Sequence, residues 1–140
     1  MKFQLVSITG LKFDDEAYEV ILPTSAGTIA IFANHMPLMS TGIAGVISVR
    51  KKSGDSDDNL EHFATSGGLI QTDGKDVTFL ADDVVQADEV TEEEAAAAIR
   101  EAEKLIKNSS SQIELHEARQ MLQRSSARLE VARLKKRHHR

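Results

Sequence analysis

The sequence contains no cysteine, no tryptophan and only two prolines, and aromatic residues make up 4% of its 140 residues. Without cysteine, the chain can form neither a disulfide framework nor a thiolate metal site. No apolar run approaches the roughly 20 residues of a membrane-spanning helix, and polar residues interrupt the first ten positions, so we expect neither membrane insertion nor a signal peptide. Every aromatic residue precedes position 80. The basic end of the chain therefore lacks stacking platforms for nucleic acid, and we expect no nucleic-acid partner.

The short motifs that carry common catalytic chemistry are also missing. The chain has no G-x-S-x-G elbow, no Walker-type phosphate loop, no H-E-x-x-H and no G-x-G-x-x-G. Its histidines are scattered, and nothing near them completes a ligand set, so we expect polar surface or turn histidines. These absences predict a protein that binds partners and does not catalyse a reaction, with no metal and no cofactor.

Charge is distributed unevenly along the chain. Residues 1–90 contain 6 basic and 14 acidic residues, whereas residues 91–140 contain 11 basic and 8 acidic ones. From Arg119 onward there are eight basic residues, and Glu130 is the one acid. Such an asymmetry predicts two segments with different roles.

The first ninety residues have the pattern of an all-β sandwich. Short, β-branched and partly alternating segments are separated by turn residues, which favours a sandwich or barrel over alternating α/β units. Asp73 and Gly74 form a strong hairpin-turn signal, and residues 53–59 predict a polar hairpin loop. The predicted strands are residues 3–8, 18–22, 28–32, 46–49, 69–70 and 77–80, with a further strand at Phe63.

Two amphipathic helices follow the predicted strands. Residues 91–94 and 111–114 both have the capping-box pattern, so we expect one helix to about Lys107 and a second one after the serine-rich loop. The two helices should form an antiparallel hairpin, giving domains at residues 1–88 and 89–140. The predicted apolar face of the first helix is Ala95, Ala98, Ala102, Leu105 and Ile106, and that of the second is Leu115, Ala118, Leu122, Ser125, Leu129 and Ala132.

Both apolar faces are thin. Burial contributes about 0.8 kcal/mol per methylene-sized group, so an alanine-rich face holds a helix only weakly. This favours a marginally docked, movable hairpin, and the alternative is a fixed bundle.

Two further segments carry charge or glycine without forming a recognisable site. Asp82, Asp83, Asp88 and Glu89 miss the EF-hand spacing, so we expect a solvated acidic linker. The glycine pair at residues 67–68 has no following helix to direct amides at a phosphate. It indicates a bulge or a close backbone approach instead.

Arg124 and Arg128 lie four residues apart on the predicted second helix. At this spacing both guanidinium groups can converge on one anion, and the alternative is a solvated basic face. Such a pair would suit a free-standing anion-binding or adaptor module.

Several segments together match the pattern of a known family. Residues 27–38 read GTIAIFANHMPL and are similar to the family's G-E-L-G-I-L-P-x-H-x-P-L. Residues 66–68, 77–82 and 124–129 follow in matching order. On these segments the chain resembles, over nearly its whole length, the ε subunit of rotary F-type ATP synthases, which is called δ in mitochondria.

The resemblance implies a β-sandwich clamped to the γ shaft and the c-ring. It also implies a C-terminal hairpin that folds against the body or extends along γ, where it meets acidic segments of the catalytic α/β subunits and opposes ATP hydrolysis. Such a non-catalytic central-stalk subunit couples rotation to ATP synthesis at the cytoplasmic face of the plasma membrane or the equivalent face of an organelle membrane. The residues implied are Thr28, Asn34, His35, Met36 and Leu38 for the c-ring and γ, and Arg119, Arg124, Arg128 and Arg133 for the catalytic subunits.

The chain departs from the family pattern at two places. Thr28, Ala30 and Ala33 stand where the family often has Glu, Gly and Pro, which implies a less polar c-ring contact. Some members bind ATP through an I/L-D-x-x-R-A motif, but residues 90–95 read VTEEEA. Arg124 and Arg128 match the second-helix arginines of those members, but Glu94 would repel a triphosphate. The resemblance thus leaves ATP as a weak regulatory ligand at most.

Overall fold

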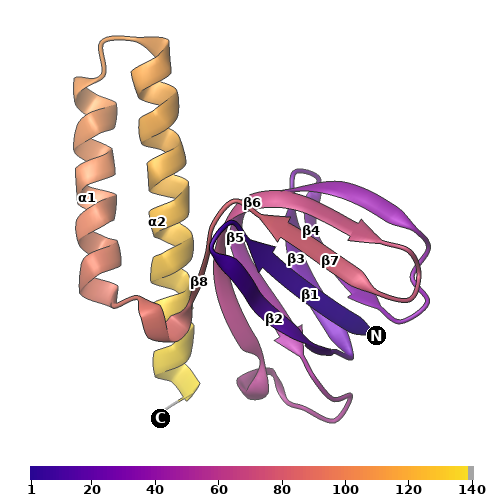
Figure 1. Cartoon of the computed structure of the whole chain (residues 1–140). Helices are drawn as coiled ribbons and strands as arrows, with labels where there is room; N and C mark the ends of the chain where they lie inside the picture. The colour runs from indigo at the N-terminus through magenta and orange to yellow at the C-terminus, as the bar shows by residue number, and fades with distance from the viewer. Residues whose placement is uncertain (139–140) are drawn as a thin grey trace.

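The computed structural model describes residues 1–138 and shows a β-sandwich body followed by an antiparallel pair of helices, which confirms the predicted fold class (Figure 1). Eight strands form the body, two short 3₁₀ turns interrupt the chain, and the two helices are joined by a three-residue loop. The strands are β1 (Lys2–Ser7), β2 (Gly10–Glu16), β3 (Glu19–Thr24), β4 (Gly27–Phe32), β5 (Leu38–Arg50), β6 (Glu61–Thr72), β7 (Val77–Ala81) and β8 (Val84–Gln86). The turns are η1 (Asp57–Asn59) and η2 (Ala87–Glu89), and the helices are α1 (Glu92–Asn108) and α2 (Gln112–His138).

The strands pair in the order β2-β1-β7-β6-β5-β3-β4, with β8 also paired to β6. The β1–β7 pair is parallel, and the other pairs are antiparallel. Alternation along β1 buries Phe3 and Leu5, and alternation along β7 buries Val77 and Phe79. The fully buried side chains of the body are Phe3, Leu5, Val20, Leu22, Ile31, Ile47, Val49, Phe63, Ile70, Val77 and Phe79.

The predicted strands are present, but the sequence prediction missed several others. Strand β2 has the sequence GLKFDDE, in which Phe13 is the one buried residue, so it lacks the apolar alternation of a strand. Strand β5 is 13 residues long, whereas residues 46–49 alone were predicted. Its first part is polar and glycine-containing, and pairing with β6 holds it extended. Strand β8 has three residues and carries too little pattern to predict.

Glycines allow the backbones of β5, β6 and β7 to approach one another closely. The sequence predicted such a close approach for residues 67–68. A Cβ atom at Gly68 would lie 2.0 Å from the Leu80 carbonyl oxygen, and one at Gly67 would lie 2.8 Å from the Gly42 carbonyl oxygen. At Gly42 a Cβ would meet the Phe79 ring at 2.6 Å. The close backbone approach that these glycines indicated is therefore confirmed.

Candidate partner-binding site

The hairpin is folded against the body through α2. Ala127 and Val131 of α2 are buried against Ala64 of β6, with Val46 and Ala87 at the edge of this cluster. Helix α1 packs on α2, on the side away from the body (Figure 1). Sequence analysis left the folded and extended forms open, and the structure shows the folded one. The apolar cluster between α2 and the body is small, and weak docking stays a prediction.

Helix α2 has two apolar faces, and the sequence analysis identified one of them. On the predicted face, Ala118, Ser125 and Ala132 are buried. Two of these residues line hollows together with residues of α1: Ala118 with Leu105, and Ser125 with Ala95. The second face consists of Ala127 and Val131. These residues are four positions apart, a helical spacing that could have indicated the face from the sequence.

Both helix starts are capped by the predicted hydroxyls, but the predicted return contact from Glu94 to the Thr91 N–H is not among the contacts of residues 1–138. The Glu94 backbone N–H donates to Thr91 Oγ1 at 3.2 Å, and the Glu114 backbone N–H donates to Ser111 Oγ at 3.1 Å. The Glu114 carboxylate accepts from the Ser110 backbone N–H at 3.0 Å, which lowers its pKa. These contacts fix the point at which each helix begins.

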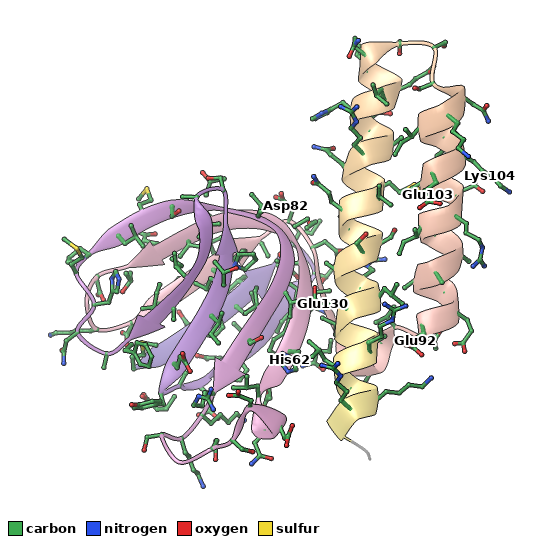
Figure 2. All side chains as sticks on the ribbon, turned by 180° about the vertical axis from the view of Figure 1, so that it is seen from behind. His62, Asp82, Glu92, Glu103, Lys104 and Glu130 are labelled. Carbon is green, nitrogen blue, oxygen red and sulfur yellow. The ribbon has the colours of Figure 1, made fainter. Side chains whose placement is uncertain are left out.

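Acidic residues between the body and α1 bind basic residues of α2, so the prediction of a merely solvated acidic linker is wrong. The Arg128 guanidinium lies 2.6 Å from Asp83 Oδ2, and Lys135 Nζ binds the Asp88 carboxylate. At the start of α1, Glu92 accepts from both Lys136 at 2.6 Å and Arg133 at 3.4 Å. Figure 2 shows Glu92 at the base of the hairpin, where α1 begins beside the C-terminal half of α2.

Glu92 binds two basic side chains of α2, those of Lys136 and Arg133. The hydrogen bond from Lys136 is the main cause that lowers the pKa of Glu92, and the charges of Lys136 and Arg133 add to it. A lowered pKa means that this contact stabilises the folded hairpin above the ordinary pKa of glutamate and is lost as pH falls through the lowered value. The contact is therefore present at neutral pH.

Arg124 and Arg128 do not converge on one site. Arg128 lines a hollow of about 340 Å³ together with Lys12, while Arg124 lines hollows on the hairpin's inner side and against β5. Three carboxylates, Asp83, Glu89 and Glu94, line the Arg128 hollow. Because Asp83 already binds Arg128 and Glu89 lies 3.9 Å from Lys12, both cations of the hollow have carboxylate partners.

Four of the five predicted c-ring and γ contacts lie together at one end of the body. Asn34 has φ 67° and its backbone N–H donates to the Gly74 carbonyl at 3.1 Å, which packs the β4–β5 loop on the β6–β7 turn. His35 Nδ1 lies 2.7 Å from the Met36 carbonyl oxygen, and Met36 is 74% exposed. Leu38 starts β5 beside them and is half-buried. Thr28 lies near the other end of β4, about 13 Å from Phe32 at 3.3 Å per strand residue.

An exposed apolar stripe crosses the outer face of the body, and the sequence analysis did not identify it. Leu69 pairs with Leu80, Leu80 with Val6, and Val6 with Leu11, so the four side chains form a row across β6, β7, β1 and β2. Leu69, Leu80 and Leu11 are 36%, 46% and 55% exposed. Contiguous exposed apolar side chains on one sheet face are typical of protein-interaction surfaces. The strand signal in residues 77–80, apolar on both faces, could have revealed it.

Within residues 1–138, no group of histidine and acidic side chains is arranged to hold a metal ion. Over the same residues, no helix combines the length and apolar character needed to cross a bilayer.

A β-sandwich with an exposed apolar stripe and a basic, ion-paired helical hairpin defines a partner-binding protein of two parts. A sequence pattern described as "ATP synthase, Delta/Epsilon chain, beta-sandwich domain" matches residues 1–87. The chain belongs to this family of ATP synthase delta/epsilon chains. Its membership does not favour the alternative of a free-standing anion-binding or adaptor module.

Relatives and solved structures agree with this assignment. The ATP synthase epsilon chain of Trichodesmium erythraeum is 34% identical over 123 residues, covering 86% of each chain. That of Francisella tularensis is 34% identical over 132 residues, covering 94% of this chain and 88% of the other. A chain in the mitochondrial ATP synthase of Euglena gracilis has the same fold, with a TM-score of 0.77 at 20% identity, covering 93% of this chain and 79% of that one. A chain of the central stalk and c-ring from Tetrahymena thermophila gives a TM-score of 0.58 at 14% identity, covering 99% and 96%.

Proposed function

We propose that this chain is a non-catalytic subunit of the central stalk of a proton-translocating F-type ATP synthase, where it couples rotation of γ and the c-ring to ATP synthesis. The observation that carries this role is the apolar stripe of Val6, Leu11, Leu69 and Leu80, because contiguous exposed apolar side chains are typical of surfaces that bind another protein. We assign the γ subunit as the partner of the stripe, because the family resemblance implies that the sandwich is clamped to γ. The subunit would work as a peripheral protein at the cytoplasmic face of the plasma membrane or the equivalent face of an organelle membrane.

The end of the body that carries the β4–β5 loop is the proposed c-ring contact. Met36 is exposed there, and Asn34 and His35 hold the loop in a defined shape against Gly74. Leu38 lies next to the loop and completes this surface. Thr28 is at the other end of β4, so we assign it to a contact separate from the loop.

The hairpin is the proposed regulatory part. In the folded form, Arg119 and Arg124 are exposed and have no ion pair within residues 1–138, whereas Arg128 and Arg133 bind acids of this chain. When the hairpin extends, these arginines would face acidic segments of the catalytic α/β subunits and oppose ATP hydrolysis. The exposed pair can meet such a surface without first breaking a contact.

The stripe can be tested by isolating the assembly with a tagged chain. Leu80→Asp places a charge in the centre of the stripe, so we expect recovery of γ and of the c-ring to fall by about tenfold or more. Leu105→Asp is a matched control, because Leu105 on α1 is 45% exposed and Leu80 is 46% exposed. The control should leave recovery unchanged. Equal recovery with both variants would remove the stripe from the interface.

ATP binding by the isolated chain should be weaker than millimolar or absent. The two cations of the Arg128 hollow already bind carboxylates, and Glu94 adds a further negative charge facing a triphosphate. Isothermal titration measures the affinity of the chain for ATP. Repeating it with Glu94→Gln tests the contribution of the Glu94 charge, because glutamine has nearly the same shape as glutamate. Micromolar binding by the native chain would contradict the proposal.

A further inference from the structure

The basic residues of α2 fall into two groups according to whether this chain already binds them. Four cations in its C-terminal half contact acids that precede or begin α1. Arg119 and Arg124, nearer the hairpin loop, and Arg137, in the last turn of α2, make no ion pair within residues 1–138. The bound cations are Arg128, Arg133, Lys135 and Lys136.

The acids that bind these cations belong to one short segment, which we name the acidic strap: Asp83, Asp88 and Glu92. The strap runs from the end of β7 through η2 to the first residue of α1, so it is the connection between body and hairpin. Its carboxylates therefore lie beside the C-terminal half of α2 whenever the hairpin is folded. Among residues 1–138, none of these three carboxylates forms an ion pair with Arg119 or Arg124.

The strap contacts are accessible to solvent. The side chains of Arg128 and Asp83 are 41% and 43% exposed, and Lys135 and Asp88 are 38% and 76% exposed. Single ion pairs of this kind contribute little and are screened by salt, but several that share one geometry act together. The apolar cluster beneath them is small, since it consists mainly of Ala64, Ala127 and Val131. The contacts of Asp83 and Asp88 add to this cluster in holding α2 against the body, and those of Glu92 hold α2 against the start of α1.

We propose that the acidic strap is a built-in competitor for the surface that α2 binds when it extends. Asp83, Asp88 and Glu92 offer α2 the same carboxylate chemistry as an acidic protein surface, so the four bound cations can engage such a surface only after leaving the strap. An acidic partner would therefore meet Arg119 and Arg124 first and then exchange with the strap for the remaining cations. The partner in this inference rests on the proposed function, but the intramolecular competition does not.

The strap makes the two groups of cations differ in a testable way. Loss of Arg124 weakens the extended form alone, because Arg124 has no strap contact to lose. Loss of Arg128 weakens both forms, because its contact with Asp83 holds the folded one. Neutralising the strap weakens the folded form alone and so favours release of the hairpin.

The direct test uses the isolated chain, which has no native cysteine and so accepts two spin labels at introduced cysteines. Ser53→Cys in the β5–β6 loop and Ser110→Cys in the α1–α2 loop report the distance between body and hairpin tip. The strap variant is Asp83→Asn, Asp88→Asn and Glu92→Gln. A matched control neutralises Glu101, Glu103 and Glu117, which are exposed and make no ion pair within residues 1–138.

We expect the strap variant to raise the ratio of released to docked hairpin by about tenfold, and the control to keep the native distance. Adding salt to the native chain should move the distance distribution in the same direction, and should do so less in the strap variant. Circular dichroism checks that the helices persist. Identical distributions for native chain, strap variant and control, unchanged by salt, would overturn the proposal.

A second arm separates this inference from the proposed function. In the assembled ATP synthase, the strap variant should lower ATP hydrolysis relative to the control, because the released hairpin reaches the catalytic subunits more often. If the isolated strap variant releases the hairpin and hydrolysis does not change, the competition stands and the braking role fails. If the hairpin is not released, the strap proposal fails whatever the hydrolysis rate.

Discussion

A chain truncated after Asp88 is expected to fold, to join an ATP synthase and to raise its rate of ATP hydrolysis by about threefold or more. The body contains all five phenylalanines and the tyrosine, and its main core cluster includes no residue of the hairpin. Truncation uncovers Ala64 and Val46, which lie on its surface beneath α2. The loss of this small contact leaves the core intact, while removal of α2 removes every arginine proposed to oppose hydrolysis.

Single substitutions measure how much individual arginines contribute to this rise in ATP hydrolysis. Arg124→Ala should raise hydrolysis in the assembled complex, and Arg128→Ala should raise it less, because Arg128 also loses its contact with Asp83. Lys104→Ala, on α1 and exposed, is a control for loss of one positive charge. Hydrolysis assays at low and high salt on complexes of equal composition measure the three rates. If the truncated chain is unfolded or is lost from the complex, the separation into two parts at residue 88 is wrong.

Gly68→Ala is expected to destabilise the body by about 3 kcal/mol or more. Its Cβ would lie 2.0 Å from the Leu80 carbonyl oxygen and 2.8 Å from the Ala81 Cα, and both neighbours are backbone of β7. Backbone in a paired strand cannot move without breaking the β6–β7 ladder, so the clash is relieved by opening the sheet. The exposed leucines of the stripe would lose their alignment at the same time.

Gly54→Ala is the matched control for this substitution. Gly54 lies in the β5–β6 loop, and an added Cβ would meet no atom within 4 Å. Its effect should stay within about 0.5 kcal/mol. Urea unfolding of both variants, followed by circular dichroism, measures the difference in the free energy of unfolding. Equal stability of the two variants would show that β6 and β7 are not packed as closely as described.

Elements whose apolar pattern is local were predictable from the sequence. The alternation in β1 and β7 and the caps at Thr91 and Ser111 depend on residues within a few positions of one another. Strand β2 was not predictable because it has a single buried residue, and pairing with β1 keeps it extended. The same applies to the first half of β5, which depends on β6.

The candidate site was predictable to a smaller extent, because its contacts depend on tertiary structure. The sequence placed Asn34, His35, Met36 and Leu38 together since they are neighbours, but it could not show that Thr28 lies at the other end of β4. The stripe joins four strands whose register cannot be read from the sequence. Likewise, the excess of basic residues in α2 was evident, whereas their contacts with the strap span 41 to 47 positions along the chain.

The most direct test of the two-part account is ATP-driven proton pumping by membranes whose ATP synthase lacks its own subunit of this family. Adding the body, residues 1–88, should restore pumping as fully as the whole chain does, because the stripe and the β4–β5 loop both lie in the body. Leu80→Asp in the body should restore little. The account would be contradicted if a folded body failed to restore pumping while the whole chain succeeded, since the hairpin would then be needed for coupling.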